Sequence, residues 1–536
     1  MPLTLLIAAA LSLLRVNLQA GNIVDPIAGE SFGNYAAFKE FDINVKNEDG
    51  VDQALKYRLY RYGAVTAKAP LVVHVHEWGG DFARMESISK YEKSGLPFVM
   101  LAFQWTKSSD NTRNWWYGKV NVATKKTVPY IHNEIIRITR QVMSTDLATT
   151  SVGSSVDSNR VYVYGHSIGG TGAVQLGMRH PEVFAAVSVN AGWTTFDDLD
   201  RPGSITNQYR TSFLYIIGST AGLERGFPVE YPDEEQVTIN INADQAHLAP
   251  GAEVKAYQYT NLAWYFTQVR NPAWPSPPVF IAQGALDNVT HQGDNLVPVL
   301  ESQRRTFTYN RTSDGHEGGG VTIKLDRLYK FRKDQSYLAF TKRDYGVNKL
   351  TEIGLFNDLR VRGWDPETIV DEPGRYKVQL TGTGTSDVTL HRLQRFTHIP
   401  GTTYTVRVNG TLLAPVKADE WGLVTVPKVK DAALIELTAD GVGIKKTIRK
   451  SIKSHGFQTI RGSRNFAFQG LPPGSRIGIQ NLAGALVKDL GKSEANGEAK
   501  WDGTFSISQA KADGIYFLKV ETPTGPAFAR LMLTPQ

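Results

Sequence analysis

The sequence contains no cysteine among its 536 residues, which excludes a disulfide framework, a thiol nucleophile and any metal site with cysteine ligands. It also has no tandem repeat and no low-complexity tract. The excess of positive charge is small, with a net charge of +7. The basic residues are spread along the chain except for one cluster in residues 445–453. A modest, dispersed charge is not the footprint of a nucleic-acid-binding protein, so we expect no nucleic-acid partner.

Long hydrophobic runs are scarce, and the one at residues 3–14 is shorter than the ~20 residues that a membrane-spanning helix needs. The run is followed by Ala20, a small residue of the kind found at cleavage sites. We therefore expect residues 1–20 to be a signal peptide and the mature chain to have no membrane span. No lysine or arginine precedes the run, so a misassigned start codon or a buried N-terminal helix stays an alternative.

The chain is longer than the ~250 to 300 residues at which a single core stops growing, so several domains are expected. Between about residues 36 and 340, strand-like and helix-like segments alternate, which predicts an α/β fold with a mostly parallel sheet between helices. Strands are expected at residues 38–45 and 55–62 as an antiparallel lead-in, and then at 71–75, 98–103, 161–164, 184–189 and 279–283. Helices are expected at residues 82–94, 128–143, 168–179, 254–269 and, as the closing element, 326–340.

Beyond residue 340 the hydrophobic pattern changes to alternation with a period of two, which predicts two all-β domains of sandwich type. We expect a catalytic domain at residues 21–340, a β-sandwich accessory domain at 341–440, a basic linker at 441–454 and a short-stranded β-domain at 455–536. Trp364 and Trp421 in the accessory domain could form a glycan-binding face or could belong to its core.

The most informative motif is Gly165-His166-Ser167-Ile168-Gly169, which lies between a predicted strand and a predicted helix. A sharp strand-to-helix turn holds a serine hydroxyl clear of the backbone, above a helix N-terminus. The pattern alone arises by chance in roughly a third of chains of this length, so its context carries the argument. A side chain at position 165 or 169 would collide with the neighbouring strand or helix. The alternative is a glycine-rich turn whose serine only caps the helix.

A serine nucleophile at this turn requires an acid and then a base further along the chain. The strand predicted at 279–283 leads into Asp287, and a further strand at 307–311 leads into His316. Ser167, Asp287 and His316 would then meet at the carboxyl ends of the strands, where open α/β sheets bind ligands. The competing bases and acids in this part of the chain are His180, His247, His291, Asp294, Asp314 and Glu317.

These three residues predict a division of labour in which His316 takes the proton of Ser167 while Asp287 holds the imidazole in the right tautomer. An acyl-enzyme would form and be hydrolysed. The oxyanion would be bound by the backbone N–H of Ile168 and by a second donor from the loop after the strand at 71–75, for which Trp78 is the candidate.

Two further features of the sequence bear on ligands. His74 and His76 point to the same face of a strand and could suit a metal, but no further ligands follow at short spacing, so we expect no metal and no cofactor. Trp115, Trp116 and Trp193 could form a stacking surface for sugar or aromatic acyl groups, or could be satellite core. The insertion at about 193–278 is expected to form a cap over the site.

On these motifs, the chain from about residue 36 to 340 resembles the α/β-hydrolase superfamily of serine esterases. Residues 165–169 match its nucleophile elbow, Asp287 and His316 match its acid and base, and residues 76–80 resemble its His-Gly-x-Gly oxyanion loop. Glu77 departs from that loop, where glycine is usual, which leaves the oxyanion donor open. Within the superfamily, the loop and elbow resemble those of secreted polysaccharide esterases and polyester depolymerases.

The C-terminal part resembles the Ig-like sorting domains of the type IX secretion pathway, on the segments 477–484, 501–503 and 513–520. This resemblance implies contact with that secretion machinery and a location that is secreted or at the cell surface of a Gram-negative bacterium. Physically, the segments predict a small β-module with glycine at its turns.

Together these features predict a secreted serine carboxylic ester hydrolase that removes acetyl or feruloyl groups from plant polysaccharides. One alternative is a serine peptidase of the prolyl-oligopeptidase type, although no region the size of a β-propeller precedes the catalytic part. The sequence also leaves open a lipid or polyester hydrolase and a non-catalytic glycan-binding surface protein.

Overall fold

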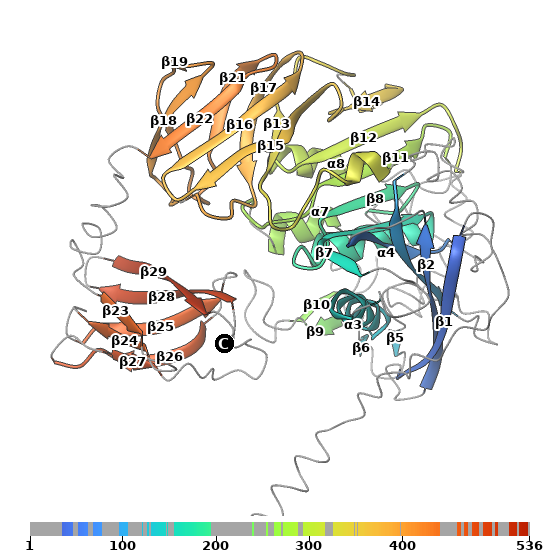
Figure 1. Cartoon of the computed structure of the whole chain (residues 1–536), viewed down its shortest axis with the longest axis horizontal. Helices are drawn as coiled ribbons and strands as arrows, with labels where there is room; N and C mark the ends of the chain where they lie inside the picture. Colours follow the sequence, from blue (N-terminus) through green and yellow to red (C-terminus); the bar gives the residue numbers. More distant parts are fainter. Residues whose placement is uncertain are drawn as a thin grey trace, which may run out of the picture.

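The structure of the chain is a computed structural model (Figure 1). It describes residues 35–46, 52–62, 68–77, 96–105, 120–121, 126–127, 130–145, 147, 155–194, 238–240, 253–255, 262–269, 272–287, 293–316, 325–347, 349–350, 352–396, 398–439, 458–461, 466–469, 474–481, 486–495, 499–501, 514–522 and 525–533. The predicted signal peptide and basic linker lie outside these residues. None of the described helices is long and apolar enough to cross a membrane.

The main element of the described chain is a nine-stranded sheet, called sheet A, in the order β1-β2-β4-β3-β7-β8-β11-β12-β14. Its strands are Tyr35–Lys46 (β1), Asp52–Tyr62 (β2), Ala69–Val75 (β3), Phe98–Trp105 (β4), Val156–His166 (β7), Ala186–Asn190 (β8), Val279–Gly284 (β11), Phe307–Thr312 (β12) and Gly354–Phe356 (β14). β1, β2 and β4 pair antiparallel in that order, and neighbours from β4 to β12 are parallel. This confirms the mostly parallel sheet and its antiparallel lead-in.

The apolar side chains of sheet A belong to two cores, one on each face of the sheet, because successive side chains of a strand point to opposite faces. Val73, Val163 and Ile281 belong to one core, which also contains residues of the helices Tyr130–Ser144 (α3), Ile168–Arg179 (α4) and Gly293–Ser302 (α8). Phe280 and Tyr162 belong to the other core. Burial on both faces explains why these strands are nearly continuous apolar runs.

The second core is shared with the β-sandwich. The predicted closing helix at 326–340 is wrong, because only Leu325–Leu328 (α9) is helical and Tyr337–Thr341 (β13) is a strand of the sandwich, paired with Thr385–His391 (β17). Aromatic rings join the two parts: Phe331 meets Phe280 edge-on at 5.7 Å and Trp364 at 5.6 Å between ring centroids. On this face of sheet A, the sandwich packs where a helix was expected.

The sandwich consists of two antiparallel sheets, visible as the yellow and orange strands of Figure 1. One contains β13, β17 and Thr425–Lys430 (β21). The other is ordered Arg362–Glu372 (β15), Arg375–Gly382 (β16), Leu434–Ala439 (β22), Thr403–Val408 (β18) and Thr411–Leu412 (β19), and Val416–Lys417 (β20) also pairs with β18. Trp364 is buried in the core, whereas Trp421 is 39% exposed. Trp364 therefore cannot belong to a glycan-binding face.

Further antiparallel strands follow toward the C-terminus, as predicted for an all-β region. They form one sheet of Gln458–Arg461 (β23), Phe466–Gln469 (β24) and Ala499–Trp501 (β27), and one of Leu486–Lys492 (β26), Arg476–Asn481 (β25), Gly514–Thr522 (β28) and Gly525–Leu533 (β29). The predicted fold class is thus confirmed: a mostly parallel sheet followed by antiparallel all-β sheets.

The predicted cap region is described only in short pieces. A small sheet joins Val120–Asn121 (β5) and Lys126–Thr127 (β6) to Thr238–Asn240 (β9) and Glu253–Lys255 (β10). The helix expected at 254–269 is wrong in its first part, because residues 253–255 form a strand, and right in its second part, where Leu262–Trp264 (α7) continues into the π-helix Tyr265–Val269. The sheet links the segment after β4 to the insertion.

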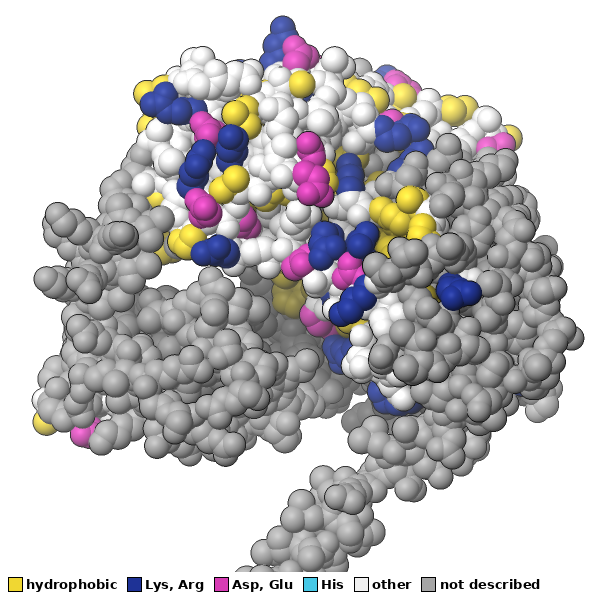
Figure 2. Space-filling model, in the orientation of Figure 1, with side chains coloured by type: hydrophobic (Ala, Val, Ile, Leu, Met, Phe, Trp, Pro, Cys, Tyr) yellow, Lys and Arg dark blue, Asp and Glu magenta, His cyan; other side chains and the backbone are white. Residues whose placement is uncertain are grey.

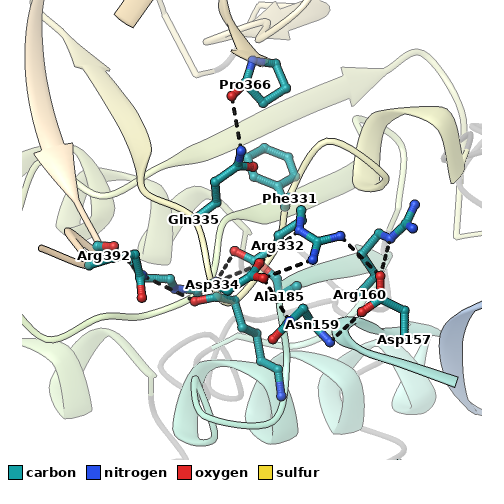
Figure 3. A network of polar contacts seen from close by, with 12 residues as sticks. Asp157, Asn159, Arg160, Ala185, Phe331, Arg332, Asp334, Gln335, Pro366 and Arg392 are labelled. Carbon is teal, nitrogen blue, oxygen red and sulfur yellow. Dashed lines mark hydrogen bonds and ion pairs between the residues drawn. The ribbon is translucent and has the colours of Figure 1, made fainter. Parts of the chain in front are cut away.

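A polar network anchors the loop between α9 and β13 to the amino ends of β7 and β8 (Figure 3). Arg332 donates to Asp157 at 3.1 Å, and Asn159 donates to Asp334 at 2.8 Å. Arg392 of the sandwich donates to the carbonyl of Arg332 at 3.3 Å. The sandwich therefore packs near the edge of sheet A opposite to its carboxyl ends. On the face drawn in Figure 2, basic and acidic side chains are interspersed over the described surface.

One buried histidine of the sandwich is expected to make the fold sensitive to acid. His391 stacks on Tyr337 with ring centroids 5.6 Å apart, and its Nε2–H donates to the carbonyl of Arg304 at 2.7 Å. Burial, with the nearby charges of Arg305 and Arg304, lowers the pKa of His391 to about 3, although the bond to the carbonyl opposes this shift. Stability from the neutral ring is complete above the unfolded pKa of about 6.5 and declines as the pH falls toward 3.

We therefore expect the wild type to lose about 2 kcal/mol more unfolding free energy than His391→Gln between pH 7 and pH 5. Urea unfolding at a series of pH values measures this difference. His398→Gln, at an exposed histidine, is the control, and it should change the pH dependence much less than His391→Gln does, because the charge of His398 contributes least to the pKa of His391. Parallel pH profiles for the wild type and His391→Gln would contradict the prediction.

Candidate active site

The turn between β7 and α4 holds Ser167 in a strained conformation. Its φ of 55° and ψ of −125° lie in a region that residues with a side chain rarely adopt, at a cost of about 1–3 kcal/mol. The backbone N–H of Ser167 donates to the carbonyl of Asn190 in β8 at 2.9 Å, and the carbonyl of Ser167 accepts from Thr171 in α4 at 3.1 Å. A strained turn fixed from both sides is typical of a nucleophile elbow.

The two glycines of the motif are required by the close approach of backbone atoms. A Cβ at position 165 would lie 2.0 Å from the carbonyl oxygen of Gly169, and a Cβ at position 169 would lie 2.2 Å from the carbonyl oxygen of Val75 at the end of β3. No rotamer change relieves contacts with backbone. The collisions expected from the sequence, with the helix and with a neighbouring strand, are therefore present.

The structure brings Ser167, His316 and Asp287 together. Ser167 Oγ lies 2.7 Å from His316 Nε2, and His316 Nδ1 lies 3.1 and 3.2 Å from the two carboxylate oxygens of Asp287. Ser167 is 6% exposed and Asp287 is fully buried, whereas the side chain of His316 is 24% exposed. The three groups form one continuous chain of hydrogen bonds from the buried carboxylate to the hydroxyl.

Backbone contacts between two loops set the separation of the acid and the base. After β11 and β12, the N–H of Ala285 donates to the carbonyl of Thr312 at 2.8 Å, and the N–H of Leu286 donates to the carbonyl of Asp314 at 2.9 Å. A Cβ at position 284 would lie 2.3 Å from the carbonyl oxygen of Gly315. The two loops thus run in contact up to Asp287 and His316, which explains why distant segments align their side chains.

Gln283 was not singled out in the sequence, and it donates from Nε2 to Asp287 Oδ2 at 2.8 Å. Gln283 is 1% exposed at the end of β11. Because Asp287 then accepts from both Gln283 and His316, the amide orients the carboxylate toward the imidazole. Its burial distinguishes it in the structure, and burial cannot be read from a single glutamine in a strand, so the sequence carries no signal for it.

We expect Gln283→Met to lower kcat about 10- to 100-fold while KM changes less than about twofold, because a hydrogen bond to a charged group is lost without loss of substrate contacts. Steady-state kinetics with a p-nitrophenyl ester measures kcat and KM separately. Gln379→Met, in β16 of the sandwich, is the matched control and should leave both constants unchanged. A rise in KM with an unchanged kcat would show that Gln283 does not position Asp287.

The candidate oxyanion donors are described only in part. Ile168 is the first residue of α4, so its N–H has no acceptor within the helix and lies directly after the nucleophile. The loop after β3 reaches the elbow, because a Cβ at position 169 would also approach the carbonyl oxygen of His76 at 2.6 Å. His76 Nδ1 lies 2.6 Å from the carbonyl of Glu77. Trp78 lies outside the described residues.

The remaining sequence-predicted ligand residues are described only in part. His74 is buried and stacks on Tyr164 at 5.4 Å; burial, then the charges of His76 and His166, lowers its pKa to about 3. Among the described residues, no group of three or more metal-ligating side chains occurs. Trp193 is buried at 4% exposure, and Trp115 and Trp116 lie outside the described residues.

The competing bases and acids differ in position from His316 and Asp287. His180 follows the far end of α4, about 20 Å along the helix axis from Ser167, and its Nε2 lies 2.8 Å from His132 Nε2. Asp314 precedes His316 in its loop and is partly exposed, and Asp294 is in α8. His247, His291 and Glu317 lie outside the described residues.

Comparisons with known proteins give similarity in structure but not in sequence. No protein-family model matches the chain, and no curated protein matches it. An S-formylglutathione hydrolase from Agrobacterium tumefaciens is 13% identical with a TM-score of 0.37, covering 57% of this chain and 97% of that one. A thermostable esterase from Pseudomonas putida is 15% identical with a TM-score of 0.33, covering 55% and 78%. A fluorophosphonate-binding serine hydrolase of Staphylococcus aureus is 11% identical with a TM-score of 0.32, covering 55% and 97%.

Proposed function

We propose that this protein is a serine hydrolase that cleaves carboxylic esters through an acyl-enzyme. The observation that carries the proposal is the hydrogen-bonded chain from Asp287 through His316 to Ser167 Oγ, with 2.7 Å between the imidazole Nε2 and the hydroxyl. Nucleophile and base are within hydrogen-bond reach and the base is oriented by a third group, which is the arrangement that activates a serine.

Acylation begins when Ser167 Oγ attacks the ester carbonyl and its proton moves to His316 Nε2. With Asp287 bound at Nδ1, the neutral ring carries its hydrogen on Nδ1 and presents the Nε2 lone pair to the hydroxyl. The tetrahedral oxyanion is bound by the N–H of Ile168 and by a second donor from the loop after β3. Collapse breaks the bond to the alcohol, which leaves with the proton from His316.

Deacylation uses the same groups in the reverse roles. His316 takes a proton from water, the hydroxide attacks the acyl-enzyme carbonyl, and Ser167 leaves with the proton as the free acid departs. Asp287 stays ionised and stabilises the imidazolium formed in each half-reaction. Atoms and charges balance with water as the only co-substrate, and no metal or cofactor takes part in these steps.

The substrate class we propose is acylated plant polysaccharide, with acetyl or feruloyl esters. The support comes from the sequence: the aromatic cluster at Trp115 and Trp116 suits stacking on sugars or aromatic acyl groups, and the elbow resembles that of secreted polysaccharide esterases. Secretion to the surface of a Gram-negative bacterium, with the C-terminal β-region as the sorting signal, is part of the same proposal. A chain truncated before residue 455 should then stay inside the cell.

The experiment that tests the function compares acetylated xylan, methyl ferulate, a polyester film and a peptide substrate in parallel, with Ser167→Ala as the blank. The proposal expects acetate or ferulate release that exceeds the blank by orders of magnitude. Cleavage of the peptide alone would favour a serine peptidase. No turnover of any ester, including short p-nitrophenyl esters, would favour a non-catalytic glycan-binding protein.

A further inference from the structure

A cavity of about 250 Å³ lies on the face of sheet A opposite to α4. Phe280 of β11 and Thr308 of β12 line it and are partners across the two parallel strands. The other walls come from two segments: residues 327–330, at the end of α9 and just after it, and residues 358–360 before β15. Phe280 is the second residue of β11, whereas Asp287 follows the carboxyl end of that strand. The cavity and Ser167 therefore belong to opposite ends and faces of the sheet.

Basic groups dominate the polar lining, which has Lys330, Arg327 and Arg360 against the single carboxylate of Asp358. That carboxylate is already engaged by Arg360, whose Nη2 donates to Asp358 Oδ2 at 2.8 Å and whose Nε donates to Oδ1 at 3.0 Å. The backbone N–H of Arg360 also donates to Asp358 Oδ1 at 2.9 Å. Asp358 is thus already neutralised by its ion pair with Arg360.

Lys330 differs from the arginine of that pair, because no carboxylate of the described chain lies within ion-pair distance of its Nζ. Its donor contact is a long one, 3.4 Å to the carbonyl of Leu359. Its Nζ lies 4.6 Å from the ring centre of Trp364 and 5.2 Å from that of Phe331. Ring faces attract a cation but do not replace a counter-ion.

Burial without a paired anion disfavours the charged form of the amine. Burial lowers the pKa of Lys330 to about 8, and the charge of Asp358 only partly opposes this shift. A desolvated ammonium without a paired anion is costly, and an anion bound in the cavity would offset that cost. The partly buried amine is therefore poised to gain a counter-ion.

We propose that this cavity binds a small organic carboxylate, held by the Lys330 ammonium with Arg327 beside it and with its carbon chain against Phe280 and Leu359. The volume is below the roughly 300–1,000 Å³ of pockets for drug-sized ligands, so the ligand is a small molecule, although a cavity of about 150 Å³ already holds a benzene ring. The apolar walls favour a carboxylate with a hydrocarbon end over inorganic phosphate, which has no apolar part to bury.

The ligand would contact sheet A and the segment that leads into the sandwich at the same time. Binding at such a position stabilises both parts against separation, because only the folded arrangement offers the complete site. The inference is independent of the proposed function, since none of the lining residues takes part in the hydrogen-bonded chain at Ser167.

The test is calorimetric titration of the full chain with sodium acetate and sodium butyrate, with sodium phosphate and sodium chloride at equal ionic strength as comparisons. Ser167 is first blocked with an organophosphonate, or replaced by alanine, so that binding of a carboxylate at the candidate active site is separated from the cavity. We expect one carboxylate per chain, with butyrate bound more tightly than acetate, and no saturable binding of phosphate or chloride.

Variants assign the binding to the cavity. Lys330→Met should weaken the carboxylate at least tenfold, and Arg327→Gln provides a second variant if Lys330→Met fails to fold. Lys417→Met, at an exposed lysine of β20, is the matched control and should bind as the wild type does. Affinity should fall from pH 7 to pH 9, because the ammonium of Lys330 loses its proton in this range whereas the guanidinium groups of Arg327 and Arg360 stay charged. The remaining charged group of the lining is Asp358.

Three outcomes would overturn the proposal. They are the absence of saturable carboxylate binding to the wild type, equal affinity in the wild type and in both cavity variants, and equal heats from phosphate and butyrate. None of these outcomes would affect ester hydrolysis, so failure here and failure of the proposed function are distinguishable.

Discussion

Replacing Ser167 with alanine is expected to lower kcat for a p-nitrophenyl ester by about 10⁵- to 10⁶-fold. The hydroxyl is the only group of the hydrogen-bonded chain that can form the acyl-enzyme, and the remaining contacts supply only binding and oxyanion stabilisation. The loss should appear in kcat, with KM little changed, because the hydroxyl is not needed to bind the ester. Stopped-flow and steady-state kinetics on the full chain measure it.

The fold should survive this substitution, because the Ser167 backbone bonds to Asn190 and Thr171 do not involve the hydroxyl. Equal melting temperatures for the variant and the wild type would confirm that only chemistry has changed. Ser313→Ala is the matched control, since Ser313 is an exposed serine in the loop that carries His316, and its activity should equal that of the wild type. Wild-type turnover by Ser167→Ala would remove the serine mechanism.

Replacing Asp287 with asparagine is expected to lower kcat by about 10⁴-fold. The asparagine keeps the volume of the buried side chain, but its amide nitrogen can only donate, so the ring can turn its hydrogen toward Ser167 and cease to be a base. The negative charge that stabilises the imidazolium is lost as well. The pH dependence of kcat/KM should be measured together with kcat, because hydroxide can partly replace the base at high pH.

Asp314→Asn is the control for this prediction, because it makes the same change two residues before His316 at a partly exposed carboxylate. Its activity should stay within about threefold of the wild type. If Asp314→Asn were the more damaging of the two substitutions, Asp287 would not be the acid, whatever its distance from the imidazole.

Local chemistry explains how much of the site could be predicted from the sequence. The elbow is a local motif of five consecutive residues, and Gly165 and Gly169 are needed wherever this turn forms. The helix that follows begins and ends at the predicted residues. Asp287 follows the buried strand β11 and His316 follows β12, so a rule of strand order was enough to select them. Gln283 was missed because a glutamine within a strand has no pattern of its own.

The sandwich contact could not be predicted in the same way. Residues 326–340 contain apolar residues whose spacing suits a helix on the sheet, yet Leu338 and Phe340 belong to a strand buried within the second core. A strand buried on both faces and a buried helix have similar apolar content, so periodicity alone does not separate them. Only the pairing of β13 with β17, about fifty residues later, decides between the two.

The central claim is that the hydroxyl of Ser167 is the activated nucleophile of an ester hydrolase. The most direct measurement is reaction of the full chain with a fluorophosphonate, in which Oγ displaces fluoride from phosphorus and the proton leaves with it, followed by peptide mapping by mass spectrometry. We expect one phosphonyl group per chain, located on Ser167, with loss of esterase activity in proportion to labelling and strongly slowed labelling in His316→Ala. A label on a different residue, or full labelling of Ser167 that leaves ester hydrolysis intact, would contradict it.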